Sequence, residues 1–350
     1  MLVVGDLFAG VGGMSQGFKM SGNFKIAFAI EYDKDIAFAY QKNHQGTDVY
    51  AKDIRDVDVK EMHQKYPFVE VIIGGPPCQG FSQKGKRLSL DDPRNFLFQQ
   101  FVRFVEEFKP KYFVLENVPT IVTTANGYFR NQIVEAFNRI GYDVTYGVLC
   151  AADYGVPQDR HRAIFLGQLD KLQIKLPIPN RERITVRDAI YDLPFIGSGG
   201  GQEEMAYDKP PITDYQKLMR KDSTVLYNHS ATNHNAKALY RLSLIPKGAG
   251  KEVLPPEERT KSIYSGTWSR MLEDDISATI TTRYDTPSSG RFTHPILDRC
   301  ITTREAARIQ SFPDTFRFYG SKTCQMKQVG NAVPPLLAYA IANVIKNNEI

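Results

Sequence analysis

The sequence has few of the features that mark membrane, secreted or metal-binding proteins. No apolar run approaches the roughly 20 residues that span a bilayer, so we expect no membrane partner. The four cysteines, at positions 78, 150, 300 and 324, have no CxxC spacing, which argues against a zinc site and a disulfide framework. Residues 1–6 lack a basic n-region and a cleavage site, and we interpret them as mature structure. These absences predict an intracellular, cytoplasmic protein without a metal.

The chain also lacks a strong charge of one sign. Its 44 Lys and Arg residues against 39 Asp and Glu residues give a net charge of +5, and the excess is not concentrated in one segment. Such a charge is only a weak indication of a nucleic-acid partner. The length of 350 residues is sufficient for two domains and a sizeable core.

The most informative stretch that is present surrounds Cys78. Residues 69–73 form a mostly apolar run that predicts a short buried strand, and the sequence GGPPCQGFS follows at 74–82. Two prolines and flanking glycines frame one thiol at a strand end, where open α/β sheets place their chemistry. The alternative is a cysteine packed as a small hydrophobe, and the Pro-Pro frame alone leaves both interpretations open.

A second pattern near the N-terminus is typical of a nucleotide site. Residues 3–8 predict a strand, AGVGG follows at 9–13, and a helix and a second strand lead to Glu31. The glycines let the backbone approach a ligand, and the acid takes ribose hydroxyls. Position 15 is Ser where GxGxxG has its third glycine, which favours an adenosyl ligand without a pyrophosphate. The alternative is an ordinary tight βα turn.

Four further features place charged residues at predicted strand ends or loops. Asp53 closes a short segment and is either a strand-end acid or the start of an Asx turn. Residues 83–92 form a basic loop that either closes over a polyanion or is simply a solvated surface loop. The strand predicted at 112–115 delivers Glu116 to the same sheet edge as Cys78. Arg160 and Arg162 lie two apart, so on an extended segment both side chains point the same way.

Strands alternate with helices over the first ~170 residues, which predicts an α/β fold with a doubly wound, mostly parallel sheet. The alternation ends at the LPIP sequence of 176–179, and the chain is then irregular and polar to about 295. Helices are predicted again at 303–311 and 336–346. We therefore expect a first domain at 1–175, completed by 300–350, and a second, smaller, irregular domain at 176–299.

At this point the chain resembles the cytosine-C5 DNA methyltransferases of the bacterial restriction-modification type. The resemblance rests on six motifs in family order over nearly the whole chain: DLFAGVGG (6–13), GPPCQGFS (75–82), ENV (116–118), QDRHR (158–162), TREAARIQSFPD (303–314) and GNAVP (330–334). It implies a Rossmann-like, class I S-adenosylmethionine-dependent methyltransferase fold. The irregular stretch at 176–299 is then the target-recognition domain.

The resemblance also implies catalytic roles. The Cys78 thiolate adds to carbon 6 of a flipped-out cytosine, and carbon 5 then accepts the methyl group. Glu116 neutralises charge on the ring nitrogen, while Arg162, with Arg160 beside it, holds the cytosine O2 and helps to keep Cys78 ionised. S-adenosyl-L-methionine is the implied methyl donor, S-adenosyl-L-homocysteine is the product, and no metal takes part.

By the same analogy, the cofactor and DNA contacts fall on particular positions. The cofactor-binding set is Phe8, Gly10, Gly12, Glu31, Tyr32, Asp53, Ile54, Pro76, Leu97, Asn331 and Val333. The DNA-binding set is Gln79, Ser82, Lys84, Lys86, Arg87, Arg270 and Arg283. Trp268, beside Arg270, has simple core packing as its alternative, and Arg283 is either a base contact or a phosphate clamp.

Double-stranded DNA is the expected partner, acted on by a monomer, and a cognate restriction endonuclease sharing the site is left open. One alternative is a tRNA cytosine-5 methyltransferase, although the Cys-Phe-Thr tripeptide typical of that subfamily is missing. Another is a catalytically inactive DNA-binding regulator, which would be expected to have lost Cys78, Glu116 or Arg162. A nicotinamide-dependent oxidoreductase is disfavoured because the third glycine is missing.

Overall fold

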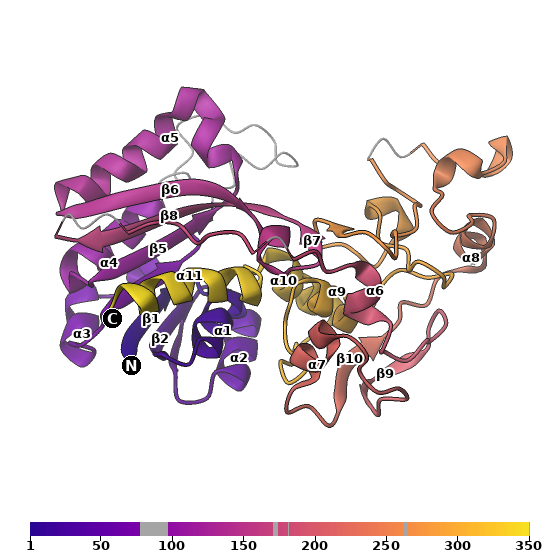
Figure 1. The fold of residues 1–350 in the computed structure, drawn as a ribbon, viewed down its shortest axis with the longest axis horizontal. Helices are drawn as coiled ribbons and strands as arrows, with labels where there is room; N and C mark the ends of the chain where they lie inside the picture. The colour runs from indigo at the N-terminus through magenta and orange to yellow at the C-terminus, as the bar shows by residue number, and fades with distance from the viewer. Residues whose placement is uncertain (78–96, 171–173, 181, 262–264, 350) are drawn as a thin grey trace. The chain divides into compact units, whose positions relative to one another are not determined.

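The computed structural model describes every residue except 78–96, 171–173, 181, 262–264 and 350. The chain divides into two compact units, whose helices and strands are labelled in Figure 1. Unit 1 comprises Met1–Tyr154, His161–Asn180 and Val333–Ile350, and unit 2 comprises Gly155–Arg160 and Arg181–Ala332.

Unit 1 is built on a seven-stranded sheet with the order β3-β2-β1-β4-β5-β8-β6. Neighbouring strands from β3 to β5 are parallel, whereas β8 runs antiparallel to both β5 and β6. The prediction of a mostly parallel sheet is therefore confirmed. The strands are β1 (Leu2–Leu7), β2 (Phe24–Glu31), β3 (Asp48–Ala51), β4 (Val71–Gly74), β5 (Tyr112–Asn117), β6 (Tyr142–Cys150) and β8 (His161–Leu169).

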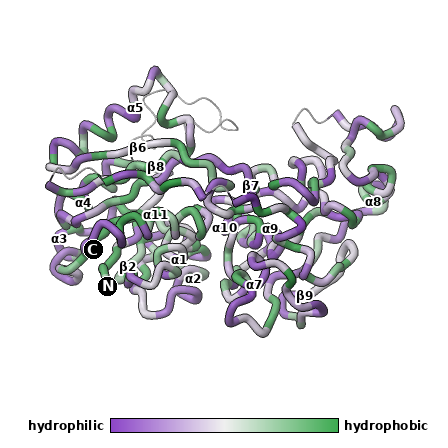
Figure 2. The backbone as a smooth tube through the Cα atoms, in the orientation of Figure 1, coloured by the Kyte–Doolittle hydropathy of each residue, from purple (hydrophilic) through white to green (hydrophobic). Residues whose placement is uncertain are grey.

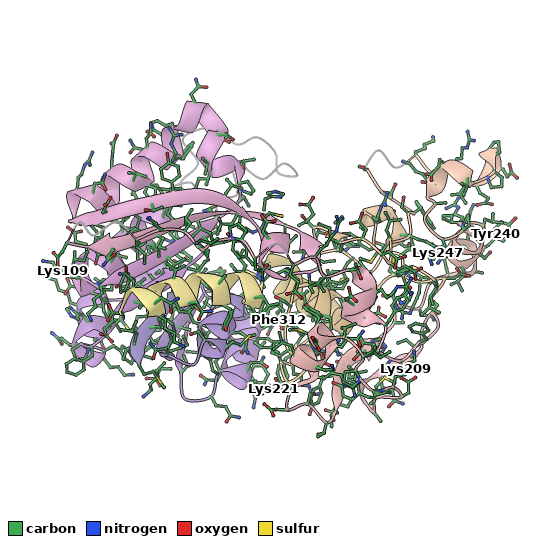
Figure 3. The ribbon with its side chains drawn as sticks, in the orientation of Figure 1. Lys109, Lys209, Lys221, Tyr240, Lys247 and Phe312 are labelled. Atoms are coloured by element: carbon green, nitrogen blue, oxygen red, sulfur yellow. The ribbon has the colours of Figure 1, made fainter. Side chains whose placement is uncertain are left out.

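Helices connect these strands and pack in two groups. Helix α11 packs along α1, while α3, α4 and α5 contact one another in sequence (Figure 1). The helices are α1 (Gly13–Met20), α2 (Lys34–Asn43), α3 (Val59–Lys65), α4 (Phe98–Phe108), α5 (Thr120–Arg139) and α11 (Pro335–Asn348), with 3-10 turns η1 (Ile54–Asp56) and η4 (Ala151–Tyr154). Lys109, labelled in Figure 3, ends α4 in the left-handed conformation at φ 44° before Pro110.

Aromatic side chains fill the core between the sheet and α4 and α5. Phe101 of α4, Phe113 of β5 and Phe137 of α5 are fully buried, and the rings of Phe113 and Phe137 stack with centroids 3.9 Å apart. Their helical and strand spacing in the sequence is that of core positions, so these aromatics serve packing.

Helix α5 is interrupted by a left-handed turn. Ala125, Asn126 and Gly127 have φ values of 51°, 54° and 83°, so the helix axis breaks before residue 128. Hydrophilic and hydrophobic residues alternate along both parts of this helix in Figure 2, as expected for an amphipathic helix over a sheet. The sequence pattern by itself predicts a helix only at 128–140, the second part.

Unit 2 has short strands and helices joined by long connections, as expected. Its strands form two pairs, β9 with β10 and β7 with β11. The strands are β7 (Gln158–Asp159), β9 (Gly201–Met205), β10 (Leu226–Ser230) and β11 (Ser277–Ala278), and the 3-10 turns are η5 (Lys251–Val253), η6 (Pro256–Glu258) and η7 (Pro287–Ser289). The helices are α6 (Val186–Ile190), α7 (Asp214–Arg220), α8 (Ala236–Ser243), α9 (Thr303–Ile309) and α10 (Lys322–Asn331).

Buried ion pairs hold the centre of unit 2 together. Thr302 caps α9 through a capping box with Glu305, which also accepts two 2.8 Å bonds from Arg299. Arg308 pairs in the same way with Asp314, at 2.6 and 2.7 Å. Beside them, Phe312 (Figure 3) packs on neighbouring phenylalanines. The TREAARIQSFPD motif thus forms the polar core of unit 2.

The boundary of unit 2 lies further along the chain than the expected division at residue 299. Helix α9 packs on α6 and β10, and α10 packs on α9, so residues 300–332 belong to unit 2. Residues 155–160 also join it, through the pairing of β7 with β11. Among the helices that the structure describes, none has the length and apolar character needed to cross a membrane.

Candidate active site

The Gly-rich turn lies between β1 and α1 in unit 1. Phe8 has a left-handed φ of 54°, and Gly10 and Gly12 have φ values of 55° and 91°. A Cβ on Gly12 would lie 2.2 Å from His44 Nε2, so only glycine fits there. A Cβ on Gly10 would meet no atom within 4 Å, so open space lies over this residue. The turn is thus closed on one side and open to a ligand on the other.

Glu31, at the end of β2, braces this turn. Its Oε2 accepts a 2.8 Å bond from the Gly10 amide, and its Oε1 accepts a 2.9 Å bond from the Asp33 amide. Burial raises the pKa of Glu31, although the two amides oppose the shift. The predicted proximity of Glu31 to the glycines is therefore present, and the amide bonds fix the direction of its carboxylate.

A buried polar cluster beneath the turn was not predicted from the sequence. The Ser15 hydroxyl donates to Asp6 at 2.6 Å, and the Tyr40 hydroxyl donates to Ser15 at 2.7 Å. Burial raises the pKa of Asp6 to about 7, against the opposing effect of these hydroxyl groups. The signal in the sequence was Ser15 at the place of a third glycine, where a small hydroxyl residue meets the β1 acid.

The remaining cofactor candidates of unit 1 differ in accessibility. Tyr32 is 74% exposed, whereas Ile54 is 4% exposed and belongs to the core. Asp53 caps η1 and pairs with Arg55 at 2.6 Å, so the Asx-turn interpretation of Asp53 is correct. Leu97 is half-buried just before α4.

The start of the Pro-Pro loop is anchored to β5. Strands β4 and β5 are parallel, which brings Gly75 beside Glu116; a Cβ on Gly75 would lie 2.8 Å from Glu116 Oε2. The Asn117 side chain donates to the Pro76 carbonyl at 3.0 Å. Pro76 is buried and Pro77 is exposed. The described part of the loop therefore leaves the sheet edge next to the Glu116 carboxylate, as the sequence predicts.

Glu116 and Arg162 form an ion pair across β5 and β8. Arg162 Nε lies 2.7 Å from Glu116 Oε1, and the side chains are only 14% and 12% exposed respectively. A second nitrogen of Arg162 donates to the His161 carbonyl at 2.7 Å. The antiparallel register, in which Asn117 faces Ala163, brings the two residues together. Two predicted catalytic residues thus meet in unit 1, with limited exposure that strengthens their interaction.

Arg160 does not share the direction of Arg162, contrary to the expectation. Position 160 lies between β7 and β8 and not within a strand, so the alternation rule does not apply to it. Its guanidinium group is 1% exposed in unit 2 and donates to the carbonyls of Ile280, Gly330 and Ala332. A direct catalytic contact of Arg160 with the base is inconsistent with this burial.

The predicted DNA contact of Arg270 is also wrong. All the guanidinium N–H groups of Arg270 are directed into unit 2, where the side chain is buried. Their acceptors are the carbonyls of Leu242, Ile245, His294 and Leu297 and the carboxylate of Asp298. Nearby, Trp268 is 6% exposed in a small apolar cluster, so the core interpretation of Trp268 holds.

Arg283 has the exposure that Arg270 lacks. Its side chain is 63% exposed and lies 3.6 Å from Asp285.

The cofactor candidates of the C-terminal motif differ in exposure. Asn331, at the end of α10, is exposed, and Val333 is 8% exposed. Six of the predicted residues lie outside the described part of the chain: Cys78, Gln79, Ser82, Lys84, Lys86 and Arg87.

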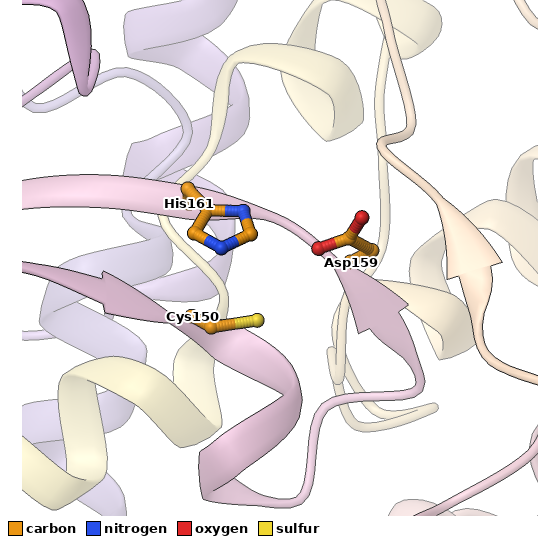
Figure 4. A group of neighbouring side chains, drawn as sticks. All are labelled: Cys150, Asp159 and His161. Carbon is orange, nitrogen blue, oxygen red and sulfur yellow. The ribbon is translucent and has the colours of Figure 1, made fainter.

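Two residues that could ligate a metal face each other across strands of unit 1. Cys150 and His161 occupy paired positions on β6 and β8 (Figure 4). Asp159, drawn with them, belongs to β7 of unit 2. A thiol and an imidazole are two ligands, fewer than the four of a structural zinc site.

Comparison with known proteins adds four matches. A profile of the family described as C-5 cytosine-specific DNA methylase matches residues 2–347. The type II methyltransferase M.DdeI of Desulfomicrobium norvegicum is 39% identical over 368 residues, covering 97% of this chain and 87% of that protein. For M1.HphI of Haemophilus parahaemolyticus the values are 38% over 345 residues, 97% and 85%. Among solved structures, a prophage-encoded DNA modification methyltransferase (E. coli) superimposes with a TM-score of 0.81, at 28% identity and 99% coverage of both chains.

Proposed function

We propose a specific reaction for this chain, which belongs to the C-5 cytosine-specific DNA methylase family. The two relatives named above are bacterial type II methyltransferases. The chain is a DNA cytosine-5 methyltransferase with S-adenosylmethionine as the methyl donor. In the proposed reaction it methylates carbon 5 of a flipped-out cytosine within a short, specific double-stranded sequence. A covalent bond between Cys78 and carbon 6 forms and breaks during each turnover.

The observation that carries this proposal is the Glu116–Arg162 ion pair beside the Cys78 loop. An acid and a guanidinium group 2.7 Å apart, both largely withdrawn from water, suit a ring that carries an exocyclic oxygen next to a nitrogen. The Asn117 bond to Pro76 holds the loop two residues before the nucleophile. All of the residues in these two observations belong to unit 1.

Three residues, Cys78, Glu116 and Arg162, have defined roles in the proposed mechanism. The Cys78 thiolate adds to carbon 6, and the electron pair of the 5,6 double bond becomes available at carbon 5. Glu116 holds a proton at the ring nitrogen and so offsets the charge that develops there. Carbon 5 gains the methyl group, then loses its proton to a base, and the returning electron pair expels Cys78 as thiolate. Arg162 orients Glu116 and donates to the cytosine O2.

The described residues of unit 1 fit an adenosyl cofactor. Open space lies over Gly10, where a ligand can approach the backbone closely. Glu31 directs a carboxylate to the same turn, and Tyr32 beside it presents an exposed ring. When bound, S-adenosylmethionine supplies an electrophilic methyl group and leaves as S-adenosyl-L-homocysteine. Phe8 and Glu31 are the residues we propose for the adenine and the ribose; Asn331 and Val333 are proposed from the C-terminal motif.

The irregular part of unit 2 is the proposed target-recognition region, with Arg283 as its exposed candidate DNA contact. The basic residues of the Cys78 loop, Lys84, Lys86 and Arg87, are proposed phosphate contacts on charge alone. A monomer is proposed as the active form, and a restriction endonuclease that cuts the same site is the proposed functional partner.

Purified protein with tritiated S-adenosylmethionine tests the reaction, using unmethylated genomic DNA and bulk tRNA as separate substrates. We expect label in DNA, none with Cys78→Ala, and a rate about 10²–10⁴-fold lower with Glu116→Gln. Glu135→Gln, on the exposed face of α5, is the matched control and should keep the wild-type rate.

Label found only in tRNA would overturn the substrate and leave the chemistry in place. DNA binding without label in either substrate would make the protein an inactive regulator. Bisulfite sequencing of labelled DNA then gives the methylated cytosine and its flanking sequence.

A further inference from the structure

Three separate segments of unit 2 meet at the side chains of Gln158 and Arg160. We call this the Gln158–Arg160 junction; it comprises these two residues and the segments 277–283, 309–310 and 329–332. Arg160 precedes Arg162 by two residues, and the QDRHR motif that contains both was expected to act on the base directly.

The Arg160 guanidinium holds backbone carbonyls from two of these segments. It donates to Ile280 at 3.0 Å and to Gly330 and Ala332 at 2.9 Å each. Gly330 and Ala332 flank Asn331, which is exposed. Fixing the carbonyl on each side of one residue restricts the backbone that carries it, so Arg160 determines where the Asn331 side chain lies.

Gln158 binds the first of the same segments from the other side. Its Oε1 accepts from the Ile280 amide at 2.8 Å, and its Nε2 donates to Gln310 Oε1 at 2.9 Å. The short parallel pairing of β7 with β11 and a 2.5 Å bond from the Thr279 hydroxyl to the Asp159 carbonyl extend this attachment. Arg283 follows Ile280 by three residues. Gln158 therefore fixes the segment that leads to Arg283.

The junction is packed backbone to backbone. A Cβ on Gly330 would lie 2.4 Å from the Thr281 carbonyl oxygen, so no side chain fits between α10 and the 277–283 segment. Gln310 donates to the Val329 carbonyl at 2.7 Å and closes the set. Because the two segments are closely packed at this contact, a shift of one segment is transmitted to the other.

We propose that Arg160 is a positioning residue that couples the cofactor and the DNA contacts. It holds Asn331 and the segment leading to Arg283 in one arrangement. Arg160 itself stands two residues before Arg162 in the sequence. Gln158 acts mainly on the DNA side, because its described side-chain bonds reach Ile280, Ile309 and Gln310, and it meets the α10 end only indirectly, through Gln310. The inference rests on the proposed function, which assigns the cofactor to Asn331 and DNA to Arg283.

Another arginine of unit 2 supplies a matched control. Arg304 is also fully buried and also donates to three backbone carbonyls, those of Tyr227, Pro313 and Phe316. None of these carbonyls lies in the 277–283 or 329–332 segments. An effect of losing a buried, carbonyl-binding arginine as such should be equal at positions 160 and 304.

The test compares Arg160→Lys, Gln158→Met and Arg304→Lys in the full-length protein. Calorimetry gives the Kd for S-adenosylhomocysteine without DNA, fluorescence anisotropy gives the Kd for DNA, and thermal unfolding gives the Tm. For Arg160→Lys we expect both Kd values to rise about tenfold, the size of one or two lost hydrogen bonds. For Gln158→Met mainly the DNA Kd should rise. Arg304→Lys should lower the Tm and leave both Kd values unchanged.

The proposal fails if Arg160→Lys matches Arg304→Lys, with a lower Tm and unchanged Kd values. It also fails if Gln158→Met weakens cofactor binding as much as Arg160→Lys does. Should Arg160→Lys not fold, Gln310→Met provides the second test, because it releases Val329 from the same α10 end and should weaken cofactor binding. A wild-type protein that binds neither ligand would instead refute the proposed function, which separates the two failures.

Discussion

Four arginines that were predicted as functional residues have different surroundings in the fold. Arg162 pairs with Glu116, Arg160 and Arg270 donate to buried carbonyls, and Arg283 is 63% exposed. Desolvating a guanidinium group is costly, so each buried one is matched to several acceptors. Only Arg162 and Arg283 retain the accessibility that contact with a substrate requires.

Arg283 and Arg270 should therefore respond differently to mutation. Arg283→Ala is expected to weaken DNA binding without a change in Tm, and the slope of log K against log salt should fall by about one if Arg283 contacts phosphate. Arg270→Lys is expected to lower the free energy of unfolding by about 2–3 kcal/mol through lost buried bonds, with the DNA Kd unchanged. Anisotropy titrations at several salt concentrations and thermal unfolding measure both. An equal loss of DNA affinity in the two variants would contradict this assignment.

Asp6 should make unit 1 less stable as the pH rises. Burial raises the pKa of Asp6 to about 7, so the folded state holds a proton between about pH 4 and 7 that the unfolded state has released. Stability is therefore lost through this window, by at most about 4 kcal/mol. In urea titrations followed by circular dichroism, the wild-type midpoint should fall more between pH 5 and 8 than that of Asp6→Asn. Parallel pH profiles would show that Asp6 does not titrate there.

Among the elements, the broken helix α5 stores strain at a residue other than glycine. Ala125 has a φ of 51°, a conformation in which the Cβ of an L-residue crowds the backbone. The turn lies between the first part of α5, which follows the strand that carries Glu116, and the part of α5 that packs on the sheet. Gly127 at φ 83° follows in the same turn and needs no such distortion.

Ala125→Gly should stabilise the protein by about 0.5–1 kcal/mol, because glycine adopts the left-handed conformation without this crowding. The control is Ala136→Gly, the same substitution in the regular part of α5, which should destabilise by about 1 kcal/mol. Urea midpoints of the two variants are compared with the wild type. A loss of stability in both would show that the turn at 125 relaxes to an ordinary helix in solution.

Elements with strong periodicity were predictable from the sequence, and elements held by tertiary contacts were not. The strands of unit 1, the Gly-rich turn and α9 follow from apolar spacing and turn chemistry. Helix α10 is polar and has no apolar periodicity, so no helix was expected at 322–331. The burial of Arg160 and Arg270 depends on carbonyls more than 20 residues away, which no local pattern records. The motifs predicted Glu116 and Arg162 as site residues, but not the ion pair between them.

At the scale of the whole molecule, two buried acids, Asp6 of unit 1 and Glu305 of unit 2, contribute to stability with opposite pH dependence. Burial by itself would raise the pKa of Glu305, but Arg299 holds it well below its usual range. A lowered pKa stabilises above the unfolded value, near pH 4.3, and that stability is lost as the pH falls. Glu305 thus makes unit 2 sensitive to acid, whereas Asp6 contributes sensitivity to base in unit 1, where buried His44, with its pKa lowered to about 3, acts in the opposite direction.

The single tryptophan allows unit 2 to be followed on its own. Trp268 is buried there, so its fluorescence reports the unfolding of unit 2. We expect its urea midpoint to fall between pH 5 and 3, and Glu305→Gln to flatten this fall while lowering the midpoint at pH 7 by the equivalent of about 3–5 kcal/mol. A Trp268 midpoint that stays constant from pH 5 to 3 would contradict the ion-pair explanation.

The packing of α11 against α1 has a consequence for the order in which the protein is made. Gly17 of α1 meets the Pro335 carbonyl so closely that a Cβ would lie 2.3 Å from it, and α1 begins where the Gly-rich turn ends. The partner of α1 is therefore synthesised about 300 residues after it. At about 5–20 residues per second, α1 waits some 15–60 seconds with its apolar face uncovered. During that time the cofactor turn lacks its support, so a nascent chain that has completed all of its recognition segment is still unable to methylate DNA.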